Sequence, residues 1–318
     1  MIDISVLVNQ LIHLFLIICI GYLVYKVGIF NDAVNKHLNK LVLNVTLPLL
    51  MISSVLNMSN PPDTEILIPL FVISIGFFIL MPVVAFIVVK IMLKTLRIVK
   101  SRQGVYMFML IFSNTAFMGM PILEAACGEN GSTAVFYAAV FNIFFNLGVF
   151  SYGVLIIGYG ETSKATFKIK SLISPGIIGS ILAIVFFLFK ITLPDTLTAT
   201  ISSVGGLTSP IAMLLIGSSL ASMKLSDVLG EWRVYVFSFL KQFILPIAFY
   251  PLFKLLISDD LLFNVIFIEF TMPIANLAFM IATEQNLDVK FVSKTIFIST
   301  AMSLITIPLV LYLCQAIY

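Results

Sequence analysis

Charged residues are scarce in this chain. Asp, Glu, Lys and Arg together make up 10% of its 318 residues, whereas a soluble domain carries roughly 25%. Apolar residues account for 60%, and the mean hydropathy is +1.13. A chain of this composition is insoluble in water unless lipid covers most of its surface. The sequence therefore predicts an integral membrane protein.

Other residue patterns are missing, and each absence excludes a class of function. The net charge is only +3, and the basic residues sit in short segments between apolar runs, which argues against nucleic-acid binding. The three cysteines (Cys19, Cys127 and Cys314) show neither metal-ligand nor disulfide spacing. No Ser/His dyad, paired aspartates or His/Glu cluster lies within the apolar runs. We therefore expect neither an enzyme nor a bound metal or cofactor.

Long apolar runs dominate what remains. A helix needs about 20 apolar residues to cross the hydrocarbon core. The first run enters the membrane without a small-residue cleavage site, so we expect a mature helix and not a signal peptide. Ten runs predict ten membrane-spanning helices near residues 5–26, 37–57, 66–93, 104–127, 132–159, 171–190, 197–223, 233–257, 262–284 and 290–317.

An internal repeat divides the chain in two. Residues 113–118 read Ser-Asn-Thr-Ala-Phe-Met and residues 275–280 read Ala-Asn-Leu-Ala-Phe-Met, 162 positions later. The same offset carries 46–51, Thr-Leu-Pro-Leu-Leu-Met, onto 208–213, Thr-Ser-Pro-Ile-Ala-Met. Two patches that share one register indicate a duplication, a plan on which many secondary transporters are built. We expect repeats at 1–160 and 161–318, joined by a short basic loop around 160–170.

Basic residues also predict the orientation. If both termini lie outside, sixteen of the Lys and Arg residues fall on the inner side, and only Lys190 and Lys254 fall on the outer side. Five spans per repeat is an odd number, so the second repeat would be inverted relative to the first. The pseudo-twofold axis would then lie in the membrane plane.

In each of two runs an Asn and a Pro lie within seven residues of each other near the middle, and the two asparagines are in repeat register. Proline removes a backbone donor and clashes with the preceding turn, and Gly119 adds backbone freedom. Two unwound stretches would meet at the bilayer midplane, where half-helix N-termini attract an anion. The alternative is an ordinary proline kink with each Asn bonding a neighbouring helix. The candidate substrate-binding residues here are Ser113, Asn114, Thr115, Pro121, Pro273 and Asn276.

A second set of residues is open to two interpretations. Thr-x-Pro recurs in the second and seventh runs, where a threonine can bond the preceding turn and widen a kink. These kinks either shape a scaffold or form a wall facing the site, and the residues are Thr46, Pro48, Thr208 and Pro210. Asn142 and Asn146 share one face of the fifth run, which suits either helix packing or a site-lining role for Asn146.

Two ionisable residues stand out within the apolar runs. Such groups are functional candidates by default. Lys241 lies eight residues into its run, so it either snorkels to the inner surface, forms a structural ion pair, or attracts an anion or couples protons. Glu269 lies deeper, four residues before Pro273, and is a candidate proton or cation site unless burial holds it neutral.

Three segments carry a resemblance to a known family. They are residues 43–48 (Leu-Asn-Val-Thr-Leu-Pro), 114–121 (Asn-Thr-Ala-Phe-Met-Gly-Met-Pro) and 209–217 (Ser-Pro-Ile-Ala-Met-Leu-Leu-Ile-Gly), and 272–284 is similar as well. In this order along the chain they resemble the auxin efflux carrier family, which includes bacterial carboxylate carriers. The resemblance implies ten helices in two inverted repeats, with the fourth and ninth broken and crossing at the substrate site.

The resemblance also implies how the protein works. A transport domain (runs 3–5 and 8–10) would move against a scaffold (runs 1, 2, 6 and 7) that dimerises. We expect a carrier of a small carboxylate in the plasma membrane, and a negative interior favours efflux of an anion. A sodium- or proton-coupled symporter of the bile-acid transporter type is the alternative. A receptor that binds without transport stays open, whereas a channel is disfavoured because the polar residues gather at one depth.

Overall fold

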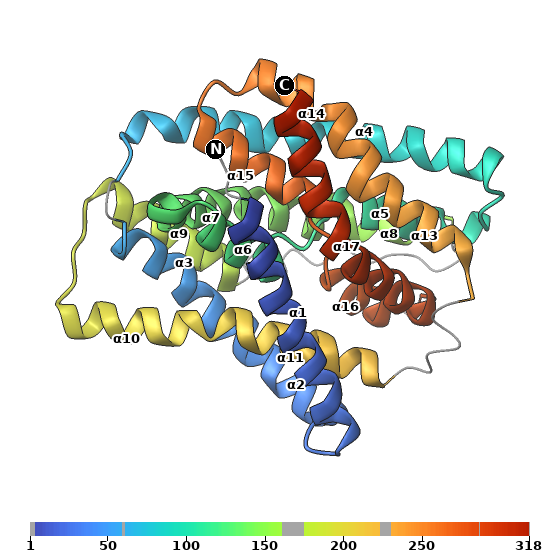
Figure 1. Cartoon of the computed structure of the whole chain (residues 1–318), viewed down its shortest axis with the longest axis horizontal. Helices are drawn as coiled ribbons and strands as arrows, with labels where there is room; N and C mark the ends of the chain where they lie inside the picture. The colour runs from blue at the N-terminus through green and yellow to red at the C-terminus, as the bar shows by residue number, and fades with distance from the viewer. Residues whose placement is uncertain (1–3, 59–60, 161–174, 223–229, 286, 318) are drawn as a thin grey trace.

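The structure is a computed structural model that describes residues 4–58, 61–160, 175–222, 230–285 and 287–317 (Figure 1). Throughout this part the chain is helical, and its only β-type pairing is an isolated bridge. The expected linker around 160–170 and four basic residues used for orientation lie outside the described residues: Lys164, Lys168, Lys170 and Lys224.

Four helices run without interruption, and six groups of helices follow one another closely along the chain. The uninterrupted helices are α1 (Ile4–Lys26), α4 (Leu67–Thr95), α9 (Pro175–Leu188) and α17 (Val289–Ile317). The groups are α2 (Asp32–Leu41), η1 (Val42–Thr46) and α3 (Leu47–Leu56); α5 (Gln103–Ile111), η4 (Thr115–Gly119) and α6 (Met120–Ala126); α7 (Gly131–Gly148), η6 (Val149–Gly153) and α8 (Val154–Ile157); α10 (Asp195–Gly206) and α11 (Thr208–Ala221); α13 (Trp232–Phe239), η8 (Leu240–Ile244) and α14 (Leu245–Leu256); α15 (Asp260–Thr271) and α16 (Leu277–Glu284).

Seven helical segments in the described part are long and apolar enough to cross a membrane. They coincide with seven of the ten predicted runs. The run at 171–190 is described only as the 14-residue α9, and the runs at 104–127 and 262–284 are each divided by a non-helical stretch. A multi-spanning helical protein is thus confirmed, whereas the ten-span inverted repeat stays a prediction.

Proline explains where several helices change their winding. Three of the π-helical segments (η1, η4 and η8) end two residues before Pro48, Pro121 and Pro246, respectively. Proline cannot donate a hydrogen bond to the carbonyl four residues back and collides with that turn. The residue before each proline instead bonds the carbonyl five residues back, as Met120 N bonds Thr115 O. The wider turn accommodates the ring without ending the helix.

Glycines allow α1 to pack very closely on α11. A Cβ atom at Gly21 would lie 2.7 Å from the Leu214 Cα atom, and a Cβ atom at Gly217 would lie 2.7 Å from the Tyr22 backbone nitrogen. Both distances are too short for non-bonded atoms, so any side chain would push the helices apart. Close approach of this kind is typical of helix pairs in lipid, where small residues bring backbones together.

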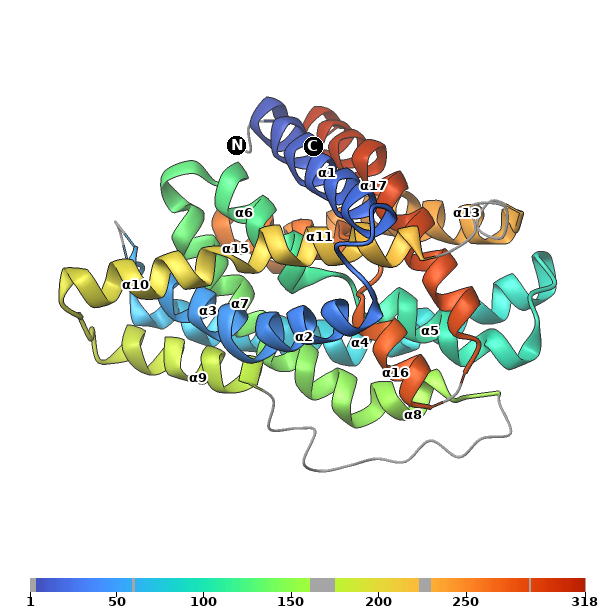
Figure 2. The same ribbon diagram turned by 90° about the horizontal axis from the view of Figure 1, so that it is seen from below.

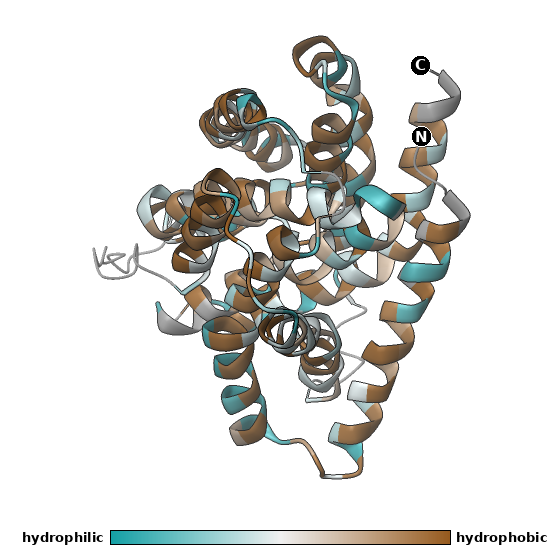
Figure 3. Cartoon of the chain, turned by 90° about the vertical axis from the view of Figure 1, so that its left-hand side faces the viewer, coloured by the Kyte–Doolittle hydropathy of each residue, from teal (hydrophilic) through white to brown (hydrophobic). Residues whose placement is uncertain are grey.

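Aromatic side chains fill the space between α4, α7 and α15. The Phe77 ring lies 5.3 Å from the Phe141 centroid and 5.6 Å from the Phe270 centroid, both edge to face. Outside this core, α4 exposes large apolar residues such as Ile68 and Ile79. Figure 3 shows hydrophobic residues along most of the helices, as a lipid-facing surface requires. The terminal helices α1 and α17 lie side by side (Figures 1 and 2).

Candidate functional site

The two divided runs meet through their backbones. Residues 112–114 lie between α5 and η4, residues 272–276 lie between α15 and α16, and Ser113 forms an antiparallel bridge with Ile274. Asn114 N donates to Pro273 O at 2.7 Å, and Ala275 N donates to Phe112 O at 3.1 Å. We call residues 112–114 the first break and residues 272–276 the second break. Each break supplies partners for backbone groups that lipid could not satisfy.

Helix ends of both signs converge on this pairing. α5 and α15 end at the breaks, while η4 and α16 begin there. The C-terminal end of a helix carries partial negative charge and the N-terminal end partial positive charge. The paired breaks therefore place backbone groups of both polarities in a buried, low-dielectric interior.

Asn114 is the side chain of the first break that combines burial with a hydrogen-bond donor left unpaired within the described chain. It is 3% exposed, and its side-chain amide nitrogen has no hydrogen-bond partner among the described residues. Its main-chain carbonyl accepts from Gly119 N at 3.1 Å and so starts the π-helical turn of η4. A buried amide donor without a partner is costly, because its hydration is lost without replacement. The amide is thus available to a ligand.

Asn142 is the residue that sequence reasoning left out of the candidate site. The Thr115 hydroxyl donates to Asn142 Oδ1 at 2.9 Å, which ties η4 to α7. Asn146 was the predicted site residue on α7, but its amide donates to the Asn142 main-chain carbonyl at 2.7 Å. The i, i+4 spacing of the two asparagines on α7 indicated that they share one helix face. It could not indicate that Asn142 would contact Thr115 in another segment.

The second break has its own surroundings. Pro273 is buried, while Asn276 is partly exposed and accepts from Phe279 N through its main-chain carbonyl at 3.0 Å. Ile274 N donates to the Ser299 hydroxyl of α17 at 3.3 Å. The structure therefore brings Ser113, Asn114 and Pro273 together, with Asn276 three residues beyond Pro273. The backbone of the second break is tied to α17.

Lys241 reaches the breaks from η8. Its side chain is fully buried, and its ammonium donates to Ser113 Oγ at 2.7 Å and to Met272 O at 2.9 Å. Snorkelling to the inner surface is therefore wrong for this lysine. A hydrogen-bonded pair with Glu269 is also excluded, since neither carboxylate oxygen of Glu269 has a partner in the described part of the chain.

Glu269 packs instead against the backbone of η4. It is 1% exposed, and a Cβ atom at Gly119 would lie 2.7 Å from the Glu269 carboxyl carbon. Gly119 has an ordinary right-handed φ of −60°. The expectation that Gly119 provides backbone freedom is therefore wrong; the glycine makes room for the carboxyl group.

The Thr-x-Pro kinks lie away from the breaks or border them only partly. Thr46 Oγ1 back-bonds to Val42 O at 3.5 Å, as predicted. Pro48 packs on Gly179, where a Cβ would lie 2.7 Å from the Pro48 Cα. Thr208 is buried and its hydroxyl has no partner among the described residues, whereas Pro210 is exposed. Whether these residues face the substrate stays a prediction.

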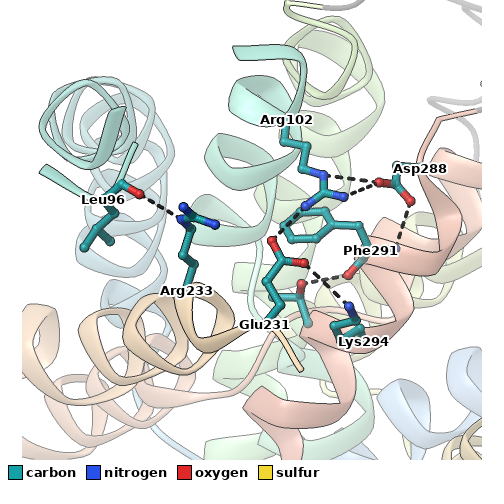
Figure 4. A network of polar contacts seen from close by, with 8 residues as sticks. Leu96, Arg102, Glu231, Arg233, Asp288, Phe291 and Lys294 are labelled. Carbon is teal, nitrogen blue, oxygen red and sulfur yellow. Dashed lines mark hydrogen bonds and ion pairs between the residues drawn. The ribbon is translucent and has the colours of Figure 1, made fainter. Parts of the chain in front are cut away.

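A cluster of ion pairs holds the start of the first divided run, at the end of α5 that is remote from the break (Figure 4). Arg102, directly before α5, bonds Glu231 Oε1 at 2.8 Å and Asp288 Oδ2 at 2.7 Å. Its guanidinium lies 4.2 Å from the centroid of the Phe291 ring, and Lys294 pairs with Glu231 at 3.5 Å. The cluster ties the beginnings of α5, α13 and α17 together. Sequence reasoning had assigned these basic residues only to an inner surface.

Comparison with known proteins agrees with a transporter. A family described as membrane transport proteins matches residues 6–311. A protein named as an uncharacterized transporter from Methanocaldococcus jannaschii is 25% identical over 300 residues, which cover 92% of this chain and 94% of the relative. A second uncharacterized transporter, from Methanothermobacter thermautotrophicus, is 25% identical over 312 residues, 95% of this chain and 96% of the relative.

The family match extends over nearly the whole chain, so the predicted resemblance is confirmed. Names of the family and of both relatives indicate transport, an activity that is generally not enzymatic. With its apolar helices and paired breaks, this chain is a multi-pass membrane protein that belongs to the membrane transport protein family of the auxin efflux carrier type.

Proposed function

We propose that this protein is a secondary transporter that moves a small organic carboxylate across the plasma membrane by alternating access. The observation that carries the proposal is the buried Asn114 amide, which has no partner in the described chain and lies where two interrupted helices pair. An amide donor fits a carboxylate oxygen, and the nearby start of η4 adds partial positive charge. Asn276, in register with Asn114, would supply a second amide.

The proposed architecture is ten helices in two inverted five-helix repeats. The pairing of the breaks supports this symmetry. The two hydrogen bonds of the bridge are related by an offset of 161, which carries Asn114 onto Ala275 and Phe112 onto Pro273 and is one residue from the repeat offset of 162. A twofold axis between the breaks would relate the two halves of the bridge. Both termini would then lie outside, and the first, second, sixth and seventh spans would form a dimeric scaffold.

Membrane potential would set the preferred direction. Moving one charge through 100 mV changes the free energy by about 2.3 kcal/mol, so a negative interior favours export of an anion. Efflux or uniport needs no coupling ion. One observation favours the second candidate, a proton- or cation-coupled symporter: Glu269 is a buried carboxyl group without a hydrogen-bond partner in the described residues.

The test is a ligand screen on the purified protein. Melting temperatures would be measured with small mono- and dicarboxylates, with and without sodium, from pH 5 to 8. A ligand at 100 times its dissociation constant should stabilise the protein by about 2.7 kcal/mol. Stabilisation without sodium supports the uniporter, and stabilisation only with sodium or at low pH supports the symporter. Failure of every carboxylate to bind, together with no carboxylate flux in vesicles, would overturn the proposal.

Two matched substitutions locate the site. Asn114→Ala and Asn276→Ala should each weaken carboxylate binding by about tenfold, since one hydrogen bond to a charged group is worth about 1.5 kcal/mol. Asn130→Ala is the control, because Asn130 is exposed in the turn between α6 and α7. Normal affinity in a folded Asn114→Ala protein would remove the breaks from the site.

A further inference from the structure

Lys241 has an unusual set of neighbours for a buried lysine. Its ammonium is completely shielded from solvent, and its two described partners are neutral oxygens: the Ser113 hydroxyl at 2.7 Å and the Met272 carbonyl at 2.9 Å. One oxygen belongs to each break. A buried ammonium normally needs a carboxylate partner, because desolvation is costly. Something other than a hydrogen-bonded carboxylate must therefore stabilise this charge.

The C-terminal end of α15 supplies one of the two contacts, and a hydroxyl just beyond the end of α5 supplies the other. Met272 caps α15, and Ser113 lies two residues after the end of α5. The last carbonyls of a helix are unsatisfied and carry partial negative charge. Met272 O brings this negative end of α15 to the ammonium, and Ser113 Oγ adds a second oxygen. Without a positive charge at this place, the break would hold buried carbonyl oxygens with too few donors.

Hydroxyl and carbonyl oxygens also form the ligand set of a hard cation. Unwound carbonyls and half-helix C-termini hold sodium ions in many secondary transporters. The same oxygens here are occupied by a cation that is covalently part of the chain. We propose that the paired breaks form a monovalent-cation site, and that the Lys241 ammonium is the occupant that the chain itself provides.

The consequence for transport rests on the proposed function. A cation that belongs to the chain joins the two breaks without a bound ion, so carboxylate binding would require no sodium. Removal of the ammonium should convert the protein into one whose folded state depends on sodium. The cation site can be tested without any substrate, which separates this inference from the proposed function.

The experiment compares melting temperatures in sodium chloride and in choline chloride at equal ionic strength, with no carboxylate present. The wild-type protein should melt at the same temperature in both salts. Lys241→Ala should melt lower than wild type in choline and gain about 3 °C or more in sodium, with a saturable dose dependence. Lys241→Arg retains a cation and should not respond to sodium. Lys254→Ala, an exposed lysine on α14, is the matched control and should not respond either.

Further variants cover the case in which Lys241→Ala does not fold. Lys241→Met fills more of the space without a charge and should show the same sodium response. Adding Ser113→Ala to either variant should reduce that response, because one ligand is lost. A folded, uncharged variant that melts at one temperature in both salts would overturn the inference. The inference would also be overturned if Lys241→Arg folds while no uncharged variant folds even in sodium chloride.

The outcomes separate the two proposals. A sodium response in Lys241→Ala, in a protein that binds no carboxylate, would support the cation site and contradict the proposed function. If the wild-type protein binds a carboxylate and its folded, uncharged Lys241 variants do not respond to sodium, the result would support the proposed function and contradict the cation site.

Discussion

The first and second breaks share one main-chain arrangement and differ in their side chains. At the first break, Asn114 is almost fully buried, and Thr115 is bonded to Asn142. At the second, Asn276 is partly exposed, and the position in register with Thr115 is Leu277. The two hydrogen bonds between the breaks, Asn114 N to Pro273 O and Ala275 N to Phe112 O, are related by an offset of 161, one residue less than the offset that relates the two motifs. The two breaks thus contribute one hydrogen bond donor each to their pairing, while the side chains around them differ.

The largest expected effect tests the space around η4. Gly119→Ala should lower the stability by about 3 kcal/mol, since its Cβ would overlap the buried Glu269 carboxyl group. Ile281 occupies the register position of Gly119 beyond the second break, so only the first break needs a glycine there. Thermal unfolding in detergent measures the change.

A double variant and a control complete this test. Glu269→Ala should restore most of the stability lost in Gly119→Ala, because it removes the overlapping atoms. Gly76→Ala in α4 is the control, as nothing lies within 4 Å of the added Cβ, and it should not destabilise. Equal losses at Gly119 and Gly76 would contradict the difference between the breaks.

A smaller effect is expected at Thr115. Thr115→Val keeps the shape but removes the hydroxyl, which leaves Asn142 Oδ1 buried without this donor. The loss should be about 2 kcal/mol, the cost of one unsatisfied buried acceptor. Thr115→Ser retains the hydroxyl and should lose clearly less. If Val and Ser destabilise equally in thermal unfolding, the bond to α7 does not hold the first break.

The smallest effects concern the ends of the divided runs that are remote from the breaks. Arg102, before α5, contacts two carboxylates and a ring, so Arg102→Ala should cost about 1 kcal/mol. At the start of α15, Lys254 pairs with Asp260 at 3.0 Å, and both side chains are more than half exposed. Lys254→Ala should therefore change stability by less than about 0.5 kcal/mol.

Ionic strength sharpens this last contrast. The loss in Arg102→Ala should persist in part at 1 M salt, because the cluster is partly buried and salt screens it less. Equal melting temperatures for the two variants at low salt would show that the Arg102 cluster stabilises the protein no more than the Lys254–Asp260 pair does.

Local features of the sequence predicted the positions of the breaks. Asn114 and Asn276, in repeat register, marked both stretches; Pro273 lies within the second break, and Pro121 acts on the turn of η4 that follows the first break. Thr46 bonds its own helix as expected. The family could likewise be predicted, because its motifs are short and contiguous.

Partners of individual side chains were harder to predict. Lys241 was placed at the surface or in an ion pair, because depth along a helix does not show which oxygens converge on it from 128 and 31 residues away. The role of Gly119 was misjudged because Glu269 approaches it from another helix. Arg102 meets partners 129 and 186 residues distant. Such contacts depend on the tertiary fold and leave no periodic pattern in the sequence.

The close packing of α1 on α11 has a mechanical consequence. Backbone atoms meet at Gly21 and Gly217, so neither helix can rotate about its axis or slide along the other without collision. Side chains can change rotamers to absorb a displacement, but a backbone cannot. These two helices must therefore move together as one rigid body. Any conformational change in this protein has to occur at interfaces where side chains separate the backbones, such as the one between α11 and η4.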